Sequence, residues 1–103
     1  MNEKQIEAKL RDAIKAMGGI AYKFTSPGNI GVPDRIVLLP GGRVWFVELK
    51  TDTGRMTATQ ERQAHRIRQT GGNVCTLYGI DQVNAFLAER RRELDGGKKN
   101  GTE

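Results

Sequence analysis

Two short apolar runs separated by one tight turn constrain the fold of this chain more than any other feature. Residues 32–39 and 43–50 are both rich in β-branched and aromatic side chains, which is typical of β-strands. Only Pro40, Gly41 and Gly42 lie between them. A three-residue hairpin loop typically needs a positive φ near its end, and Gly42 adopts one without steric cost. We therefore expect an antiparallel hairpin.

The length of this loop also determines which residues face each other. With a three-residue loop, Leu39 lies opposite Arg43. Counting outward along both strands then pairs Asp34 with Glu48. Directly opposed side chains have Cβ atoms roughly 4.5–5.5 Å apart, and the strand period of two puts Lys50 on the same face. We expect these three ionisable groups to converge on one spot.

Two facing carboxylates repel each other and destabilise a sheet unless something neutralises them. A divalent cation would do so, and carboxylate oxygens suit Mg²⁺ or Mn²⁺, with phosphate and water filling the remaining coordination positions. Alternatively, Lys50 bridges Asp34 and Glu48 as a structural salt bridge near the end of the sheet. The spacing alone leaves both interpretations open.

The rest of the chain predicts an α/β fold, a mixed β-sheet flanked by helices in the order αβββαβα. Besides the hairpin we expect a helix capped by Asn2 and ending before Gly18, a strand over 20–25, a helix from Thr57 to Thr70, a strand over 73–78 and a helix from Asp81 to Leu94.

A chain of 103 residues fits one domain, here 1–94. Residues 95–103 carry no apolar side chain and are expected to form a disordered basic tail.

Charge and cysteine content narrow the function classes. The 17 Lys and Arg against 12 Asp and Glu give a net charge of +5, which favours a polyanion such as nucleic acid, although a general solubility charge explains it too. We expect no membrane span, no signal peptide and a cytosolic location. Cys75 is the single cysteine, and its apolar surroundings predict a buried, inert thiol.

Taken together, the acidic pair, the lysine and the element order resemble the PD-(D/E)XK nuclease superfamily and, within it, the VRR-NUC domain. The resemblance covers residues 3–94. It is carried by a first helix with Glu7 and by three runs, Gly31-Val32-Pro33-Asp34, Val47-Glu48-Leu49-Lys50 and Thr57-Ala58-Thr59-Gln60. The acid-x-Lys core is short, but the joint pattern at this spacing is considerably more specific.

The resemblance implies a restriction-endonuclease-like core and a Mg²⁺- or Mn²⁺-dependent phosphodiesterase. Versions of this size that stand alone in phages and bacteria look like homodimeric, structure-selective DNA endonucleases of the Holliday-junction-resolving type, acting in the bacterial host cytosol if phage-encoded. Asp34 and Glu48 would be metal ligands together with the backbone carbonyl of Leu49. Lys50 would position or help deprotonate the attacking water.

The same resemblance assigns supporting residues, each of which also has a structural explanation. Glu7 would be a further acid at the site and candidate metal ligand, or a solvated helix charge. Gln60 would lie beside the site, or serve only as the capping-box partner of Thr57. The candidate DNA contacts, which equally suit a solvated basic face, are Arg62, Arg66, Arg55, Lys23, Arg35 and Ser26.

Aromatic residues are expected to stabilise the fold. Trp45 alternates to the face opposite Glu48, and we interpret it as core. Tyr22 and Phe24 are expected in the core or an interface, not as platforms for nucleic-acid bases.

Two rival functions remain open at this stage. In one, the fold is a non-catalytic DNA-binding or structural module in which Asp34, Glu48 and Lys50 form a closed ion network. In the other, the protein is an exonuclease or a restriction-type nuclease of the same fold.

Overall fold

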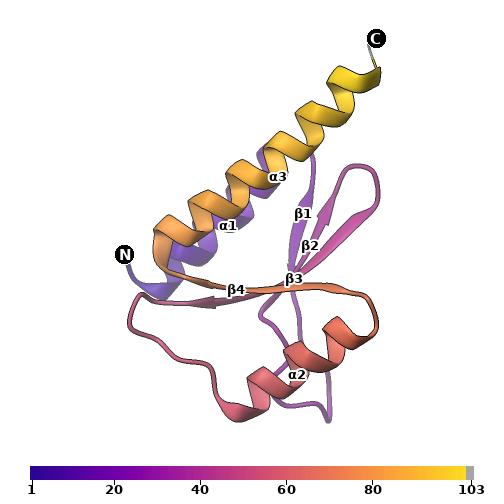
Figure 1. Cartoon of the computed structure of the whole chain (residues 1–103). Helices are drawn as coiled ribbons and strands as arrows, with labels where there is room; N and C mark the ends of the chain where they lie inside the picture. Colours follow the sequence, from indigo (N-terminus) through magenta and orange to yellow (C-terminus); the bar gives the residue numbers. More distant parts are fainter. Residues whose placement is uncertain (102–103) are drawn as a thin grey trace.

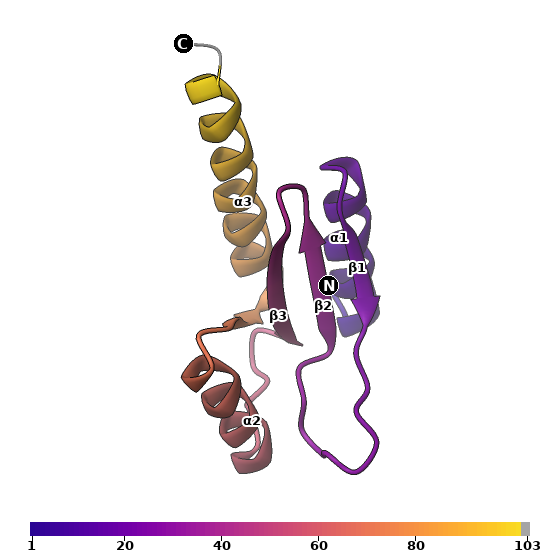
Figure 2. The same cartoon turned by 90° about the vertical axis from the view of Figure 1, so that its right-hand side faces the viewer.

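A four-stranded mixed sheet forms the centre of the protein, with helices on both faces (Figure 1 and Figure 2). The computed structural model describes the backbone of residues 1–101 and the side chains of residues 1–96. The elements are α1 (Glu3–Ala16), β1 (Ile20–Lys23), β2 (Arg35–Leu39), β3 (Arg43–Lys50), α2 (Ala58–Gln69), β4 (Asn73–Tyr78) and α3 (Gly79–Gly101). The predicted fold class and element order are confirmed.

The β2–β3 hairpin has the predicted register. Leu39 pairs with Arg43, and the ladder continues outward to Arg35 opposite Val47. The amide of Gly42 donates to the Leu39 carbonyl at 3.1 Å, which closes the turn. Both Gly41 and Gly42 have positive φ, at 89° and 79°, so the turn requires two glycines where the sequence analysis expected one.

The order of strands in the sheet is β1-β2-β3-β4. The first three strands are antiparallel neighbours, because short loops connect them, whereas β4 runs parallel to β3 after the crossover through α2. The strand β3 therefore lies inside the sheet, paired with β2 over residues 43–47 and with β4 over residues 45–50, so that residues 45–47 are paired on both sides.

Capping boxes begin two of the helices, as predicted. The side chain of Asn2 accepts from the Gln5 amide and that of Gln5 accepts from the Asn2 amide, both at 2.9 Å. Thr57 and Gln60 make the equivalent pair at the start of α2, at 3.1 and 2.9 Å. Each box satisfies two amides that have no partner within the helix.

The hydrophobic core lies between the sheet and the helices α1 and α3. On β3, Val47 and Leu49 point into this core and are fully buried. They belong to one cluster with residues of α1, β2 and α3, among them Ile6, Leu10, Ile14, Val37, Leu39, Val83 and Leu87. The helix α2 lies apart from this core, on the opposite face of the sheet beside β4 (Figure 1). One face of the sheet is therefore sealed by two helices and the other only partly covered.

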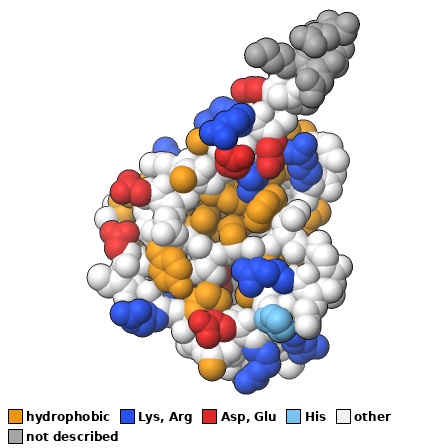
Figure 3. Space-filling model, in the orientation of Figure 1, with side chains coloured by type: hydrophobic (Ala, Val, Ile, Leu, Met, Phe, Trp, Pro, Cys, Tyr) orange, Lys and Arg blue, Asp and Glu red, His pale blue; other side chains and the backbone are white. Residues whose placement is uncertain are grey.

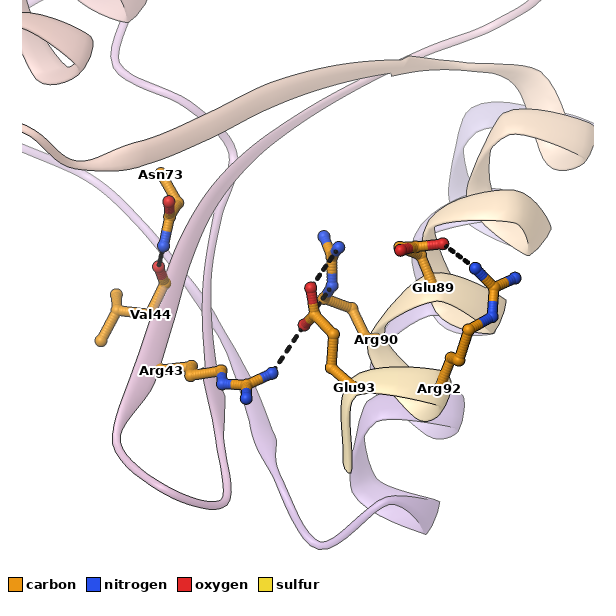
Figure 4. Close-up of polar contacts among 7 residues, drawn as sticks. All are labelled: Arg43, Val44, Asn73, Glu89, Arg90, Arg92 and Glu93. Carbon is orange, nitrogen blue, oxygen red and sulfur yellow. Dashed lines mark hydrogen bonds and ion pairs between the residues drawn. The ribbon is translucent and has the colours of Figure 1, made fainter. Parts of the chain in front are cut away.

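A polar network fastens the hairpin to α3 (Figure 4). The Arg90 guanidinium, buried to 7% exposure, lies 4.4 Å from the centre of the Trp45 ring and donates twice to Glu93 at 2.9 Å. Glu93 also accepts from Arg43 at 2.8 Å. Trp45 is packed against the core, as predicted, and its ring also holds the Arg90 guanidinium in a cation–π contact.

Three element boundaries differ from the sequence-based expectation. Pro33 and Asp34 precede β2, because proline has no amide to donate to the ladder. The first strand ends at Lys23, although the Phe24 amide still donates to the Asp34 carbonyl at 2.8 Å. The last helix begins at Gly79, before the predicted Asp81 cap.

The predicted tail also differs in part. The helix α3 continues to Gly101, past the expected end at Leu94, because glycine weakens a helix by about 1 kcal/mol per residue without preventing it. Residues 102 and 103 lie outside the described part of the chain. Among the described residues, no helix has the length and apolar character needed to cross a membrane.

Candidate active site

The end of the hairpin brings Asp34 and Glu48 together. One step beyond the last ladder pair, Arg35 opposite Val47, the register puts Asp34 opposite Glu48 on the face turned away from α1 and α3. The carboxylate of Asp34 accepts from the amide of Leu49 at 2.9 Å, so the loop residue is fixed to the backbone of β3. The predicted approach of these two acids is therefore present.

Glu48 occupies an unusual position for a carboxylate. Its side chain is 4% exposed, and one oxygen accepts from Gln60 Nε2 at 3.1 Å and lies 3.5 Å from Lys50 Nζ. The other oxygen, Oε1, is buried without a hydrogen-bond partner among the described residues. An unpartnered buried carboxylate oxygen costs free energy, so this atom is a position where a further ligand would stabilise the protein.

The electrostatics of Glu48 are consistent with this interpretation. Burial, and after it repulsion from Asp34, together raise its pKa from the ordinary value of 4.5 to about 7, while the cation of Lys50 acts in the opposite direction. A positive ion at this position would reverse the shift, because it favours the charged carboxylate.

Lys50 completes the group from the last position of β3. Two residues beyond Glu48, its side chain lies on the same face and is 17% exposed. It is thus partly shielded from solvent yet accessible to a substrate at the rim of the sheet.

The helix α2 contributes Gln60 from its first turn. Gln60 has both functions weighed in the sequence analysis, since its Oε1 accepts from the Thr57 amide and its Nε2 donates to Glu48. A Cβ on Gly31 would approach the backbone carbonyl carbon of Thr59 at 2.9 Å, so only glycine allows the loop before Asp34 to pack against this helix turn. Gly31 belongs to one of the runs that carry the family resemblance, but its packing against α2 was not predicted.

Glu7 is not brought to the acidic pair. It accepts from Arg35 at 2.6 Å and lies 3.8 Å from Lys23 Nζ, on the α1 side of the sheet. No group of three His, Cys, Asp or Glu side chains within the described residues is arranged to hold a metal ion. The predicted role of Glu7 as a further metal ligand therefore has no support in this geometry.

The predicted DNA contacts divide into two groups. Arg35 does not fit, because its side chain is buried and bound to Glu7 and to the carbonyl of Ala21. The remaining basic candidates are all exposed, namely Arg55, Arg62, Arg66 and Lys23. Basic side chains are visible over α2, at the bottom of the view in Figure 3. Ser26 is half-buried in the loop between β1 and β2.

Other reactive side chains do not join the site. Burial raises the pKa of the Cys75 thiol to about 11, so this cysteine is a poor nucleophile, as predicted. His65 is exposed on α2.

The residues at the acidic pair fit a divalent cation. They offer oxygen ligands of the kind that Mg²⁺ and Mn²⁺ prefer, and the unpartnered Glu48 Oε1 gives a specific position for one. Two carboxylates and a backbone carbonyl leave further coordination positions for water and phosphate.

Two solved structures share this fold. One, described as "VRR_NUC domain", is 31% identical and superimposes with a TM-score of 0.79, covering 84% of this chain and 94% of its own. A second, described as "VRR_NUC domain protein", is 15% identical with a TM-score of 0.69, covering 86% and 87% of the two chains. The second likeness shows the fold alone, whereas the first connects this chain to nucleases of one class.

The sequence comparison gives the same result. The chain is 44% identical over 81 residues to a protein described as "Putative nuclease p44" from Acyrthosiphon pisum secondary endosymbiont phage 1, covering 79% of this chain and 87% of that protein. No model of a protein family matches the chain. The chain belongs to the VRR-NUC nucleases of the PD-(D/E)XK superfamily, and its relative is a phage protein.

Proposed function

We propose that the protein hydrolyses phosphodiester bonds of DNA as a Mg²⁺- or Mn²⁺-dependent endonuclease. The observation that carries this proposal is the pairing of two facing carboxylates with a buried carboxylate oxygen that has no partner among the described residues. Asp34, Glu48 and the backbone carbonyl of Leu49 would hold the ion. Glu7 contributes only indirectly, through its ion pair with Arg35, the neighbour of Asp34.

The chemistry that such an ion supplies is charge stabilisation at the phosphate and a lowered pKa of bound water. The protein's own groups prepare the site for it. The Leu49 amide and Gln60 Nε2 fix the orientation of the two carboxylates. Lys50, beside Glu48, orients the attacking water and offsets the negative charge that develops on the phosphate.

We further propose that the substrate is branched DNA, as for junction-resolving enzymes, and that two copies act together in the host cytosol. Paired incisions at a junction require two sites, and a twofold dimer supplies them most simply. Exposed Ile20 and Tyr22 on the edge strand β1 are a reasonable first position to test for the contact between copies.

A rival function is favoured by one contact. The 3.5 Å ion pair between Lys50 and Glu48 suits a closed, internally neutralised network in a non-catalytic DNA-binding module. Thermal melting separates the two functions, because an ion bound only by the folded state raises Tm by mass action. A nuclease site predicts an increase in Tm with Mg²⁺ or Mn²⁺, and a closed network predicts none.

Cleavage of labelled branched, flapped, single-stranded and linear DNAs tests whether the protein cuts DNA, which DNA structure it prefers, and whether it cuts internally or from the ends. Lys50→Ala should lower the rate by roughly 10²- to 10⁴-fold while DNA binding is retained, because Lys50 acts on the reacting groups. Lys15→Ala, an exposed lysine on α1, is the matched control and should leave the rate unchanged. Equal cutting by wild type and Lys50→Ala would remove Lys50 from the mechanism, and cutting confined to DNA ends would indicate an exonuclease.

A further inference from the structure

A groove lies beside the acidic pair, on the same face of the sheet. It is bounded by the loop between β1 and β2, by β3 and by α2, and has a volume of about 380 Å³. This volume is at the small end of the range for ligand sites, roughly 300–1,000 Å³. The groove therefore suits a group about the size of one nucleobase and is too small for duplex DNA.

The groove neighbours the proposed active site along three elements, each of which carries a residue of both. Phe46 lies two residues before Glu48 on the same face of β3, which corresponds to about 7 Å along the strand. Val32 lies two residues before Asp34 in the loop. On α2, Gln63 follows Gln60 by one turn. A nucleotide in the groove would thus neighbour a phosphate at the acidic pair.

The walls of the groove are apolar and partly aromatic. Phe24, Val32, Phe46 and Ile67 line it, and all four are only half-buried. The rings of Phe24 and Phe46 lie 5.7 Å apart at 55° to each other. Half-exposed aromatic rings of this kind are platforms on which unpaired bases stack, since every base has a π-face. The role of Phe24 differs here from the core or interface position expected from sequence.

The rim of the groove is polar and positively charged. Asn29 Nδ2 donates to Ser26 Oγ at 3.0 Å, and Gln63 Nε2 donates to the Ile30 carbonyl at 3.2 Å, so the loop is held against α2. Arg66 is exposed at the same rim and forms no ion pair within the described residues. A guanidinium next to an apolar groove matches the two parts of a nucleotide, the phosphate and the base.

We propose that this groove binds one unpaired nucleotide of the DNA substrate next to the bond that is cut. Its base lies against Phe24 and Phe46, and its phosphate contacts Arg66. The inference rests on the proposed nuclease function and refines its substrate class, since it explains selectivity for DNA with an unstacked base beside the cleavage position.

Binding of wild-type protein without divalent ions tests the inference. The probes are a duplex with one unpaired adenine at a branch point, the same duplex with an abasic residue there, and a fully paired duplex, each followed by fluorescence anisotropy. The adenine should strengthen binding roughly 5- to 150-fold over the abasic residue, which is the range expected for stacking one base. Equal affinity for the adenine and abasic DNAs would overturn the proposal.

Variants assign the two contacts. Phe24→Leu keeps an apolar wall but removes one of the two rings, and should reduce the difference between adenine and abasic DNA. Arg66→Gln should weaken binding of both DNAs equally and reduce the salt dependence. The matched control is Arg68→Gln, an exposed arginine outside the groove, which should leave the adenine-to-abasic ratio and the salt dependence nearly unchanged. Equal effects of Arg66→Gln and Arg68→Gln would remove the phosphate contact.

A parallel cleavage assay with Mn²⁺ keeps this inference separate from the proposed function, because the binding assay does not depend on hydrolysis. A preference for the unpaired base without any cutting would refute the nuclease proposal and retain the groove. Cutting without that preference would refute the groove alone. If Phe24→Leu does not fold, the affinities of the wild-type protein for the adenine and abasic DNAs still test whether the groove binds an unpaired base.

Discussion

The two faces of the sheet differ sharply although the same strands build both. On the side of α1 and α3, Val47 and Leu49 are fully buried in a dry core. On the side of α2, Glu48 and Lys50 from the same strand meet Asp34, and a groove opens beside them. Alternation along β3 thus places the core on one face of the sheet and the candidate site on the other.

The difference teaches how a small domain keeps a destabilising site. A buried carboxylate near another acid costs free energy, and this cost falls on an inner strand of the sheet that is paired with β4 at Glu48 and anchored by a closed core on its other face. The helix α2 covers the chemical face only in part, which leaves room for a substrate.

The largest expected effect compares neighbouring leucines of β2 that point to opposite faces. Leu39 is 5% exposed in the core, and Leu38 is half-buried on the other face. Leu39→Ala should lower the free energy of unfolding by about 2–5 kcal/mol, and Leu38→Ala by about 1 kcal/mol, because only the first leaves a closed cavity. Urea unfolding of both variants measures this. Similar losses would contradict the contrast between the faces.

The second prediction concerns Glu48 and pH. In the folded protein its pKa is raised to about 7 from an ordinary 4.5, so protonated Glu48 stabilises the fold fully below pH 4.5. Between pH 4.5 and 7 the Glu48 carboxyl ionises in the unfolded chain but stays protonated in the folded protein. The free energy of unfolding therefore falls as pH rises, and the contribution of protonated Glu48 is lost by about pH 7. In EDTA, Glu48→Gln should therefore gain stability relative to wild type across this window, by up to roughly 3 kcal/mol.

Thermal or urea unfolding of both proteins between pH 4 and 8 measures the difference. Because other acids titrate in both proteins, the difference between them reports Glu48. Adding Mg²⁺ or Mn²⁺ should stabilise wild type more than Glu48→Gln. A difference that is independent of pH would show that Glu48 is not perturbed.

The smallest expected effect separates the two functions of Gln60. Thr57→Ala and Gln60→Ala both break the capping box and should each cost about 1 kcal/mol. Only Gln60→Ala also removes the hydrogen bond to Glu48, so only this variant should slow cleavage, by about tenfold. Unfolding and cleavage assays on both variants check this. If both variants cleave DNA equally slowly, the role of Gln60 is limited to capping α2.

Local rules predicted most of the fold. Capping boxes at Asn2 and Thr57 and the glycine turn after Leu39 fixed the elements and the hairpin register, because each depends on residues close in sequence. The predicted start of α3 was wrong, because the helix begins at Gly79, and the side chain of Gln82 in its first turns accepts from the Tyr78 amide just before it. Several polar side chains near the start of this helix could cap it, and the sequence does not distinguish between them.

The site was predictable only where register determined it. Asp34, Glu48 and Lys50 follow from the hairpin and the strand period. Gln60 was predicted as the capping partner of Thr57 and, from the resemblance, as a residue beside the site, but its hydrogen bond to Glu48 was not. The ion pair between Arg35 and Glu7 was not predicted, because it joins residues from different elements that lie far apart in the sequence. The groove depends on the packing of α2 against the loop, which no local pattern reveals.

The alternation along β3 also determines where the chain tolerates changes in length. One residue inserted between Arg43 and Lys50 would turn Glu48 inward and Val47 outward, so folding and chemistry would be lost together. At the hairpin tip, by contrast, Gly41 and Gly42 are exposed and lie beyond the last ladder pair, Leu39 with Arg43, so residues added there project into solvent. Lengthening is therefore best accommodated at that tip, which makes it the natural attachment point for a label or a fused peptide that leaves the reacting groups in register.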